Sequence, residues 1–240
     1  MLVGDMLPLE LREDSDGILY IDDILEHNVH TKFLYQPNSF KYQFFNIPST
    51  NEYILKYYKF NTLDSDLMAF KKMLMEINKR RERLQEIDFP IGYFIEENEF
   101  KGLIIYFYSN ALSLRDLSLN YDFNYLSNYY FHTDNPHQNL LMLYLDILTL
   151  LEKMMDEKIY YLDVHSGNFV LYNNNVKVID FEPTQLMFDN INNVSYQRII
   201  DDFIRMVNYT NHKLGLEVNL DNEFNIKGLR NAVKKLERRL

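Results

Sequence analysis

The first 108 residues combine two patterns of apolar positions. Short aromatic-rich runs separated by polar turns are typical of β-strands, and they lie at 32–35, 39–46, 52–60, 91–96 and 102–108. Between the third and fourth runs, residues 63–86 carry apolar side chains such as Phe70, Leu74 and Ile77 at helical spacing, which predicts a helix with one apolar face. This part of the chain is therefore expected to form a five-stranded antiparallel sheet with one helix.

The pattern becomes mainly helical after residue 108. Apolar residues at helical spacing predict helices at 112–119, 138–158 and 196–209. Two apolar runs, 169–171 and 176–179, are joined by a polar turn and predict a pair of strands. We therefore expect an α+β protein of two lobes, a strand-rich lobe at 1–108 and a mainly helical lobe at 109–240.

Composition and charge exclude several classes of protein. The 240 residues carry 25 Lys and Arg against 35 Asp and Glu, and the net charge of −10 argues against nucleic acid as a partner, because such binding needs a basic surface. The absence of Cys excludes disulfides, thiolate zinc sites and Cys nucleophiles and fits a reducing compartment. The N-terminus does not resemble a signal peptide, and Asp146 and Glu152 interrupt the most apolar segment, 140–155. We expect a cytoplasmic protein without a membrane partner.

A polar cluster follows the long predicted helix. Asp163, His165 and Asn168 lie between that helix and an apolar run, and Asp180 ends the next run. Half-buried Asp residues at strand ends need partners, and a metal ion bound by carboxylate and amide oxygen atoms is one such partner. Helix caps and turns are the alternative for these residue types.

This segment resembles the protein-kinase-like superfamily. The run D-V-H-S-G-N at 163–168, followed by I-D-F-E at 179–182, is similar to the catalytic loop and metal-binding Asp of that superfamily. The form resembles the D-x-H-x-G-N variant that is common in aminoglycoside and choline kinases and their bacterial relatives, and the resemblance covers about residues 35–205. It implies that Asp163 accepts a proton from the attacking hydroxyl and that Asn168 and Asp180 bind Mg²⁺.

The same resemblance implies a nucleotide site in the first lobe. Lys56 on the third predicted strand would hold the α- and β-phosphates of ATP, and Glu76 on the predicted helix would orient Lys56. Lys59 and Glu82 are the alternatives, because spacing alone selects between these residues.

Other parts of the superfamily pattern are present with changes. Phe107, Tyr108 and Ser109 would form the hinge beside the adenine ring, and Asp202 resembles the Asp that binds the backbone of the catalytic loop. The first hairpin turn, 36–39, has no Gly, so the glycine-rich loop is missing. Side chains in that turn would bind the phosphates instead, and the two proposed for this role are Asn38 and Ser39.

The resemblance implies a phosphotransferase that needs ATP and Mg²⁺ and moves the γ-phosphoryl group to a hydroxyl acceptor. We expect a Ser/Thr-type protein kinase. The alternatives are a small-molecule kinase of the aminoglycoside or choline kinase type and a pseudokinase that acts as a binding module. Asp163, Asn168 and Asp180 favour an enzyme, whereas the missing glycines favour a pseudokinase.

Overall fold

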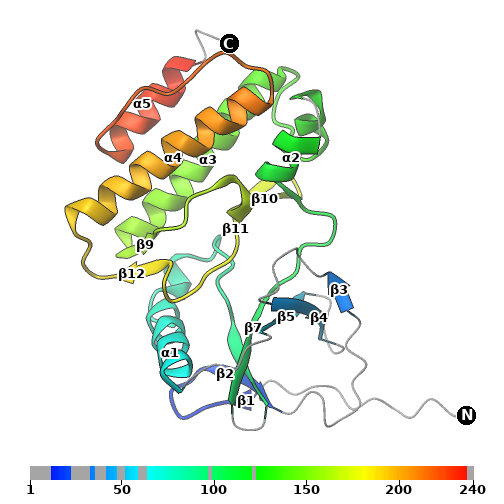
Figure 1. Ribbon diagram of the computed structural model, residues 1–240, viewed down its shortest axis with the longest axis vertical. Helices are drawn as coiled ribbons and strands as arrows, with labels where there is room; N and C mark the ends of the chain where they lie inside the picture. Colours follow the sequence, from blue (N-terminus) through cyan, green and yellow to red (C-terminus); the bar gives the residue numbers. More distant parts are fainter. Residues whose placement is uncertain are drawn as a thin grey trace, which may run out of the picture. The chain divides into compact units, whose positions relative to one another are not determined.

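The chain folds into two compact units that both contain strands and helices (Figure 1). The computed structural model describes residues 12–22, 33–35, 42–47, 52–58, 64–96, 99–120 and 123–236. The first unit is Met1–Glu82 with Asp88–Tyr108, and the second is Arg83–Ile87 with Ser109–Leu240. The predicted α+β class is confirmed. Asn38, Ser39 and Lys59 lie outside the described residues.

A seven-stranded sheet in the order β1-β2-β6-β7-β5-β4-β3 forms the first unit. Its strands are β1 (Arg12–Glu13), β2 (Leu19–Asp22), β3 (Phe33–Tyr35), β4 (Tyr42–Asn46), β5 (Tyr53–Tyr58), β6 (Gly92–Glu96) and β7 (Glu99–Tyr106). β2 pairs with β6 in parallel, and the other pairs are antiparallel. The five predicted strands correspond to β3–β7 and pair in antiparallel fashion as expected, but the predicted number of strands is wrong, because β1 and β2 extend the sheet and β2 joins it in parallel. The sheet gains the two extra strands because Ile18 and Ile21 are buried.

The predicted helix at 63–86 is shorter in the structure. Helix α1 spans Asp64–Asn78, and a 3-10 turn follows at Arg81–Arg83. Beyond the helix, Arg80 folds back, with its N–H bonded to Ile77 O at 2.9 Å and its Nη1 to Glu76 O at 2.8 Å. These bonds satisfy carbonyl groups that a continuing helix would otherwise use, so they end the helix early.

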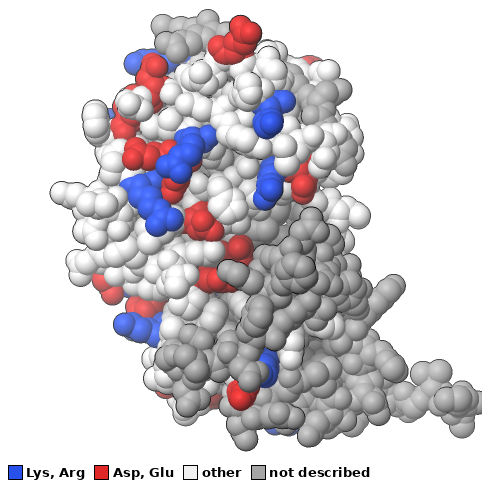
Figure 2. Space-filling model, in the orientation of Figure 1, with Lys and Arg blue, Asp and Glu red and all other residues white. Residues whose placement is uncertain are grey.

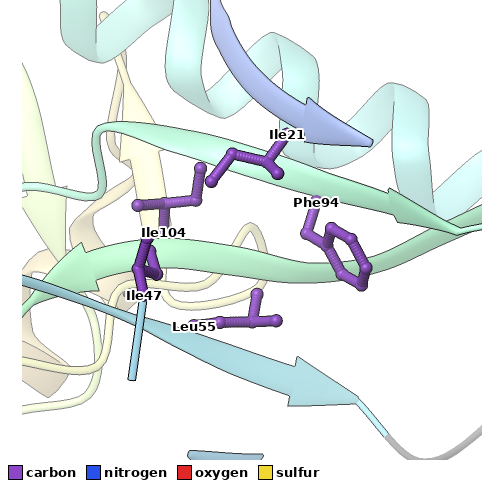
Figure 3. Packing of buried hydrophobic residues seen from close by; sticks show 5 residues of the cluster. All are labelled: Ile21, Ile47, Leu55, Phe94 and Ile104. Atoms are coloured by element: carbon purple, nitrogen blue, oxygen red, sulfur yellow. The ribbon is translucent and has the colours of Figure 1, made fainter. Parts of the chain in front are cut away.

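The two faces of the sheet pack differently. One face holds a buried cluster that draws on four strands and the end of β4: Ile21, Ile47, Leu55, Phe94 and Ile104 (Figure 3). On the other face α1 packs, because its Phe70 ring lies 4.3 Å from the ring of Phe100 and 5.7 Å from that of Tyr58. Residues two apart on a strand share a face, and Lys56 lies two residues before Tyr58 on β5. Lys56 therefore lies on the face that α1 covers.

Asp14, in the turn between β1 and β2, fastens this hairpin to α1 and β6. It accepts hydrogen bonds from Lys71 Nζ at 2.8 Å and from Tyr93 Oη at 2.7 Å. Burial alone would raise the pKa of Asp14, but the hydrogen bonds from Lys71, Tyr93, Ile18 N–H and Asp16 N–H outweigh it and lower the pKa from 3.8 to about 2. Burial of the Tyr93 hydroxyl and its hydrogen bond to Asp14 raise the pKa of Tyr93 to about 12.

The second unit is mainly helical. Its helices are α2 (Leu114–Asn120), α3 (Pro136–Asp156), α4 (Asn193–Lys213) and α5 (Ile226–Leu236). Its strands are β8 (Leu112–Ser113), β9 (Ile159–Tyr161), β10 (Phe169–Tyr172), β11 (Asn175–Val178) and β12 (Leu186–Phe188). These strands form two small sheets, β11-β10-β8 and β12-β9, and α5 packs on α3 and α4.

Helices occur at the three predicted places in this unit, but the sequence pattern does not predict α5, β8, β9 or β12. α4 begins three residues before its predicted start, because Asn192 caps it by accepting a hydrogen bond from Ser195 N–H at 2.8 Å. On the face drawn in Figure 2, acidic and basic side chains of this unit are interspersed. Among the described residues, no helix is both long and apolar enough to span a membrane.

We predict that Asp14→Asn lowers the free energy of unfolding by about 2 kcal/mol at pH 7. The pKa of Asp14 is lower in the folded protein than in the unfolded chain, so its contribution is complete above the unfolded value of 3.8 and disappears as the pH falls to about 2. Urea unfolding at several pH values measures this difference. Asp16→Asn, in the same turn with an exposed side chain, is the matched control. A difference between wild type and Asp14→Asn that stays constant down to pH 2 would contradict the role of the carboxylate.

Candidate functional site

The polar cluster found in the sequence forms a tight loop between β9 and β10. Residues 162–165 lead into a 3-10 turn at Ser166–Asn168. His165 caps this turn, because its Nδ1 accepts a hydrogen bond from Gly167 N–H at 3.1 Å. His165 therefore braces the loop.

Asn168 is the buried centre of this loop, with a relative exposure of 4%. Its Nδ2 donates to Asp163 O at 3.0 Å and to Asp163 Oδ2 at 2.9 Å. Its backbone O accepts from Ile179 N–H at 2.9 Å, which extends the β10–β11 ladder towards Asp180. One buried residue thus joins the segment of Asp163 to the segment of Asp180. Because Nδ2 is bonded to Asp163, Oδ1 is the amide oxygen that remains for a metal ion.

The carboxylate of Asp163 is fixed through one oxygen atom. Oδ2 accepts hydrogen bonds from Asn168 Nδ2 and from Gln185 Nε2, both at 2.9 Å, and lies 3.4 Å from His165 Nε2. No described residue donates a hydrogen bond to Oδ1. The side chain is 31% exposed. Asp163 is therefore oriented by the protein and keeps one oxygen atom that can accept a proton from a bound molecule.

Asp180 adopts a backbone conformation that is uncommon for residues other than Gly, with a φ of 64°. Tyr161 holds this segment, because its hydroxyl donates to Ile179 O at 3.1 Å and lies 3.5 Å from Asp180 O. Burial raises the pKa of Tyr161 well above its usual value, and the charges of Asp180 and Asp163 raise it further, so the hydroxyl stays protonated as a donor. The ring of Phe181 is buried 5.5 Å from that of Tyr161.

These residues suit Mg²⁺ better than a metal held by protein groups alone. No group of three or more His, Asp or Glu side chains in the described part of the chain is placed to hold a metal ion. Mg²⁺ is usually bound by one or two protein oxygen atoms together with phosphate and water. Asn168 Oδ1 and the Asp180 carboxylate provide oxygen atoms of this kind, so the residues present fit the ion.

In the first unit, Lys56 on β5 is only 2% exposed, which is rare for Lys unless it is paired or functional. Its Nζ lies 5.4 Å from the ring centroid of Tyr58. The backbone of β7 approaches it closely at Gly102, where a Cβ atom would lie 2.5 Å from Lys56 O. A side chain at position 102 would therefore displace the strand that carries Lys56.

Glu76 lies on α1, as the sequence predicts, but its carboxylate is paired with cations that follow it by three and four residues. Its carboxylate contacts Lys79 Nζ at 2.5 Å and Arg80 Nη1 at 2.6 Å, and these hydrogen bonds lower its pKa. The structure therefore does not bring Lys56 and Glu76 together. Their ion pair stays a prediction for an active conformation. Glu82, the alternative, is an exposed residue of the 3-10 turn.

The predicted hinge residues follow β7. Phe107 N–H donates to Glu52 O at 2.8 Å, so it cannot donate to adenine without loss of that bond. The hydroxyl of Tyr108 donates to Asp88 Oδ2 at 2.6 Å, and Ser109 is exposed. A hinge contact with adenine stays a prediction.

Two features of the second unit differ from the sequence-based expectation. Asp202 contacts Arg205 at 3.0 Å and Arg198 at 3.4 Å on its own helix, instead of binding the loop that holds Asp163. Gln185, which donates to Asp163, is missed by sequence analysis, because no motif singles out a Gln so far along the chain from the residue it contacts.

We predict that Asp180→Gly is more stable to unfolding than Asp180→Ala by about 1 kcal/mol, because Gly accepts a positive φ without steric cost. Both variants lose the carboxylate equally, so the difference reports the backbone alone. Asp201, an exposed residue inside α4, is the matched control, and there Ala should be more stable than Gly. Chemical unfolding measures all four variants. Equal stabilities at position 180, or the order seen at position 201, would contradict the backbone conformation.

Comparisons with known proteins find the fold but no sequence family. No protein-family model matches the chain, and no curated protein matches it. A solved structure of an apo pseudokinase matches with a probability of 1.00 and a TM-score of 0.53, over 81% of this chain and 71% of that chain. The two sequences are 13% identical. A likeness at this identity establishes the fold alone, and the fold of this chain is protein-kinase-like.

Proposed function

We propose that this chain is an ATP- and Mg²⁺-dependent phosphotransferase that moves the γ-phosphoryl group of ATP to a hydroxyl acceptor. One observation carries the proposal. The Asp163 carboxylate is held at Oδ2 by Asn168 and Gln185, whereas no described residue donates a hydrogen bond to Oδ1. A general base must be fixed in orientation and must keep a lone pair for the incoming proton, and Asp163 meets both requirements.

The roles of the other residues follow from charge. ATP brings several negative charges, so transfer of its γ-phosphoryl group needs positioning and charge neutralisation more than covalent chemistry. Asn168 and Asp180 would hold Mg²⁺, which supplies positive charge to the phosphate oxygens. Lys56 would contribute a cation to the α- and β-phosphates. Asp163 would orient the acceptor hydroxyl and accept its proton as the hydroxyl oxygen bonds to the γ-phosphorus, while the bond from that phosphorus to the β–γ bridging oxygen breaks and ADP leaves.

We propose that the acceptor is the hydroxyl of a Ser or Thr residue in a protein, as for a Ser/Thr-type protein kinase. A small alcohol is the alternative. The same set of groups serves both, because Asp163 acts only on the hydroxyl. The absence of Cys from the whole chain fits action in the reducing cytoplasm.

A second candidate function is that of a pseudokinase, which binds without transferring phosphate. Two observations favour it. The similar solved structure is a pseudokinase, and Glu76 is paired with Lys79 and Arg80 in place of Lys56. The retained Asp163, Asn168 and Asp180 favour the enzyme, since binding alone does not need an oriented base.

We predict that Asp163→Asn lowers the turnover of ATP by about 10² or more, the usual scale for loss of a general base. The affinity for ATP should stay nearly constant, because Asn keeps the size of Asp and the proposed metal ligands remain. Transfer from radiolabelled ATP to a panel of proteins and small alcohols measures turnover, and calorimetry measures affinity.

Asp134→Asn is the matched control, because Asp134 is an exposed residue of the same unit. It should leave turnover unchanged. Equal turnover by wild type and Asp163→Asn, or no transfer by wild type to any acceptor while ATP binds, would refute the enzyme and favour the pseudokinase.

A further inference from the structure

Gln185 is the one residue from outside the catalytic loop that donates a hydrogen bond to Asp163 among the described residues. Its Nε2 lies 2.9 Å from Asp163 Oδ2, 22 residues away in the chain. This contact is as short as the one from Asn168. Asp163 is thus held from two directions, by an amide of its own loop and by an amide from a separate segment.

The backbone of Gln185 is fixed where it meets the loop. Gln185 N–H donates to Glu182 O at 2.9 Å, and Gln185 O accepts from Leu162 N–H at 2.7 Å. The next residue, Leu186, pairs with Tyr161 in the β12–β9 ladder. Main-chain bonds therefore set the position from which the side chain of Gln185 reaches Asp163.

The orientation of the Gln185 amide follows from the chemistry of its partner. An ionised carboxylate only accepts hydrogen bonds, so Nε2 must face Asp163 and Oε1 must point away. In that orientation Oε1 is buried and has no hydrogen-bond partner. A buried carbonyl without a partner destabilises a fold. Gln185 keeps this unsatisfied carbonyl in order to donate to Asp163. Its hydrogen bond to Asp163 therefore indicates a use other than stability.

We propose that Gln185 is a positioning residue that orients the Asp163 carboxylate for proton transfer, an inference that rests on the proposed phosphotransferase function. Two amides pin Oδ2, so Oδ1 points in one direction instead of exchanging places with it by rotation. The short segment 180–185 then carries both a proposed metal ligand, Asp180, and the residue that orients the base. The pairing of β12 with β9 holds this segment at Asp163.

The test uses Gln185→Leu, which removes the donor and the unsatisfied carbonyl together at similar volume. We expect turnover to fall roughly tenfold to a hundredfold, since small misplacement of a catalytic group has effects of this size. The KM for ATP should stay within about twofold of wild type, because Gln185 acts on the base. The melting temperature should stay the same or rise.

The matched control is Gln197→Leu. Gln197 Nε2 donates to Asp201 Oδ1 at 2.9 Å, a bond between the same residue types on α4. Its loss should leave turnover unchanged. The double variant Gln185→Leu/Asp163→Asn should turn over no more slowly than Asp163→Asn alone, because Gln185 is expected to act through Asp163. A residue with a merely structural role would lower turnover again in that background.

The outcomes separate this inference from the proposed function. An active wild type with unchanged turnover in Gln185→Leu, or with additive losses in the double variant, overturns the role of Gln185 and leaves the phosphotransferase in place. An inactive wild type overturns both. Should Gln185→Leu fail to fold by circular dichroism, Gln185→Asn replaces it, since its shorter amide cannot reach Asp163 and should show the same loss of turnover.

Discussion

The buried amide of Asn168 is the interaction on which the candidate site depends. Its Nδ2 holds Asp163, and its backbone oxygen holds Ile179 beside Asp180. Asn168 is buried and its bonds to Asp163 are part-buried, so an Asn168 amide left without these partners would be costly. Asn168 thus fixes the orientation of Asp163 and the position of the segment that leads to Asp180.

The sequence predicted the part of the site that depends on local spacing. Asp163 and Asn168 lie five residues apart, close enough for the loop alone to bring them into contact, and Asp180 ends the adjacent strand. Contacts that depend on tertiary structure left no such pattern. Gln185 reaches Asp163 through the pairing of β12 with β9, and Glu76 has cations in the next turn of chain that compete for its carboxylate.

The same difference between local sequence patterns and tertiary contacts applies to the fold. The sequence placed helices α2, α3 and α4 and strands β3–β7 to within a few residues, whereas α1 ends at Asn78 instead of residue 86 and α5 was not predicted. The hairpin β1–β2 has two short strands, and its place in the sheet depends on Asp14, whose partners Lys71 and Tyr93 come from α1 and β6. A propensity pattern does not contain such long-range bonds. The kinase-like fold is common to enzymes and pseudokinases, so the chemistry of Asp163, Asn168 and Asp180 must decide between them.

We propose that Asn168 and Asp180 present oxygen atoms to a metal ion that accompanies ATP. A crystal structure of the protein with Mg²⁺ and a non-hydrolysable ATP analogue tests it most directly. We expect one Mg²⁺ at about 2.1 Å from both Asn168 Oδ1 and an oxygen of the Asp180 carboxylate, with phosphate and water as the remaining ligands. A bound nucleotide whose metal contacts neither residue, or an Asn168 amide turned away from Asp163, would contradict it.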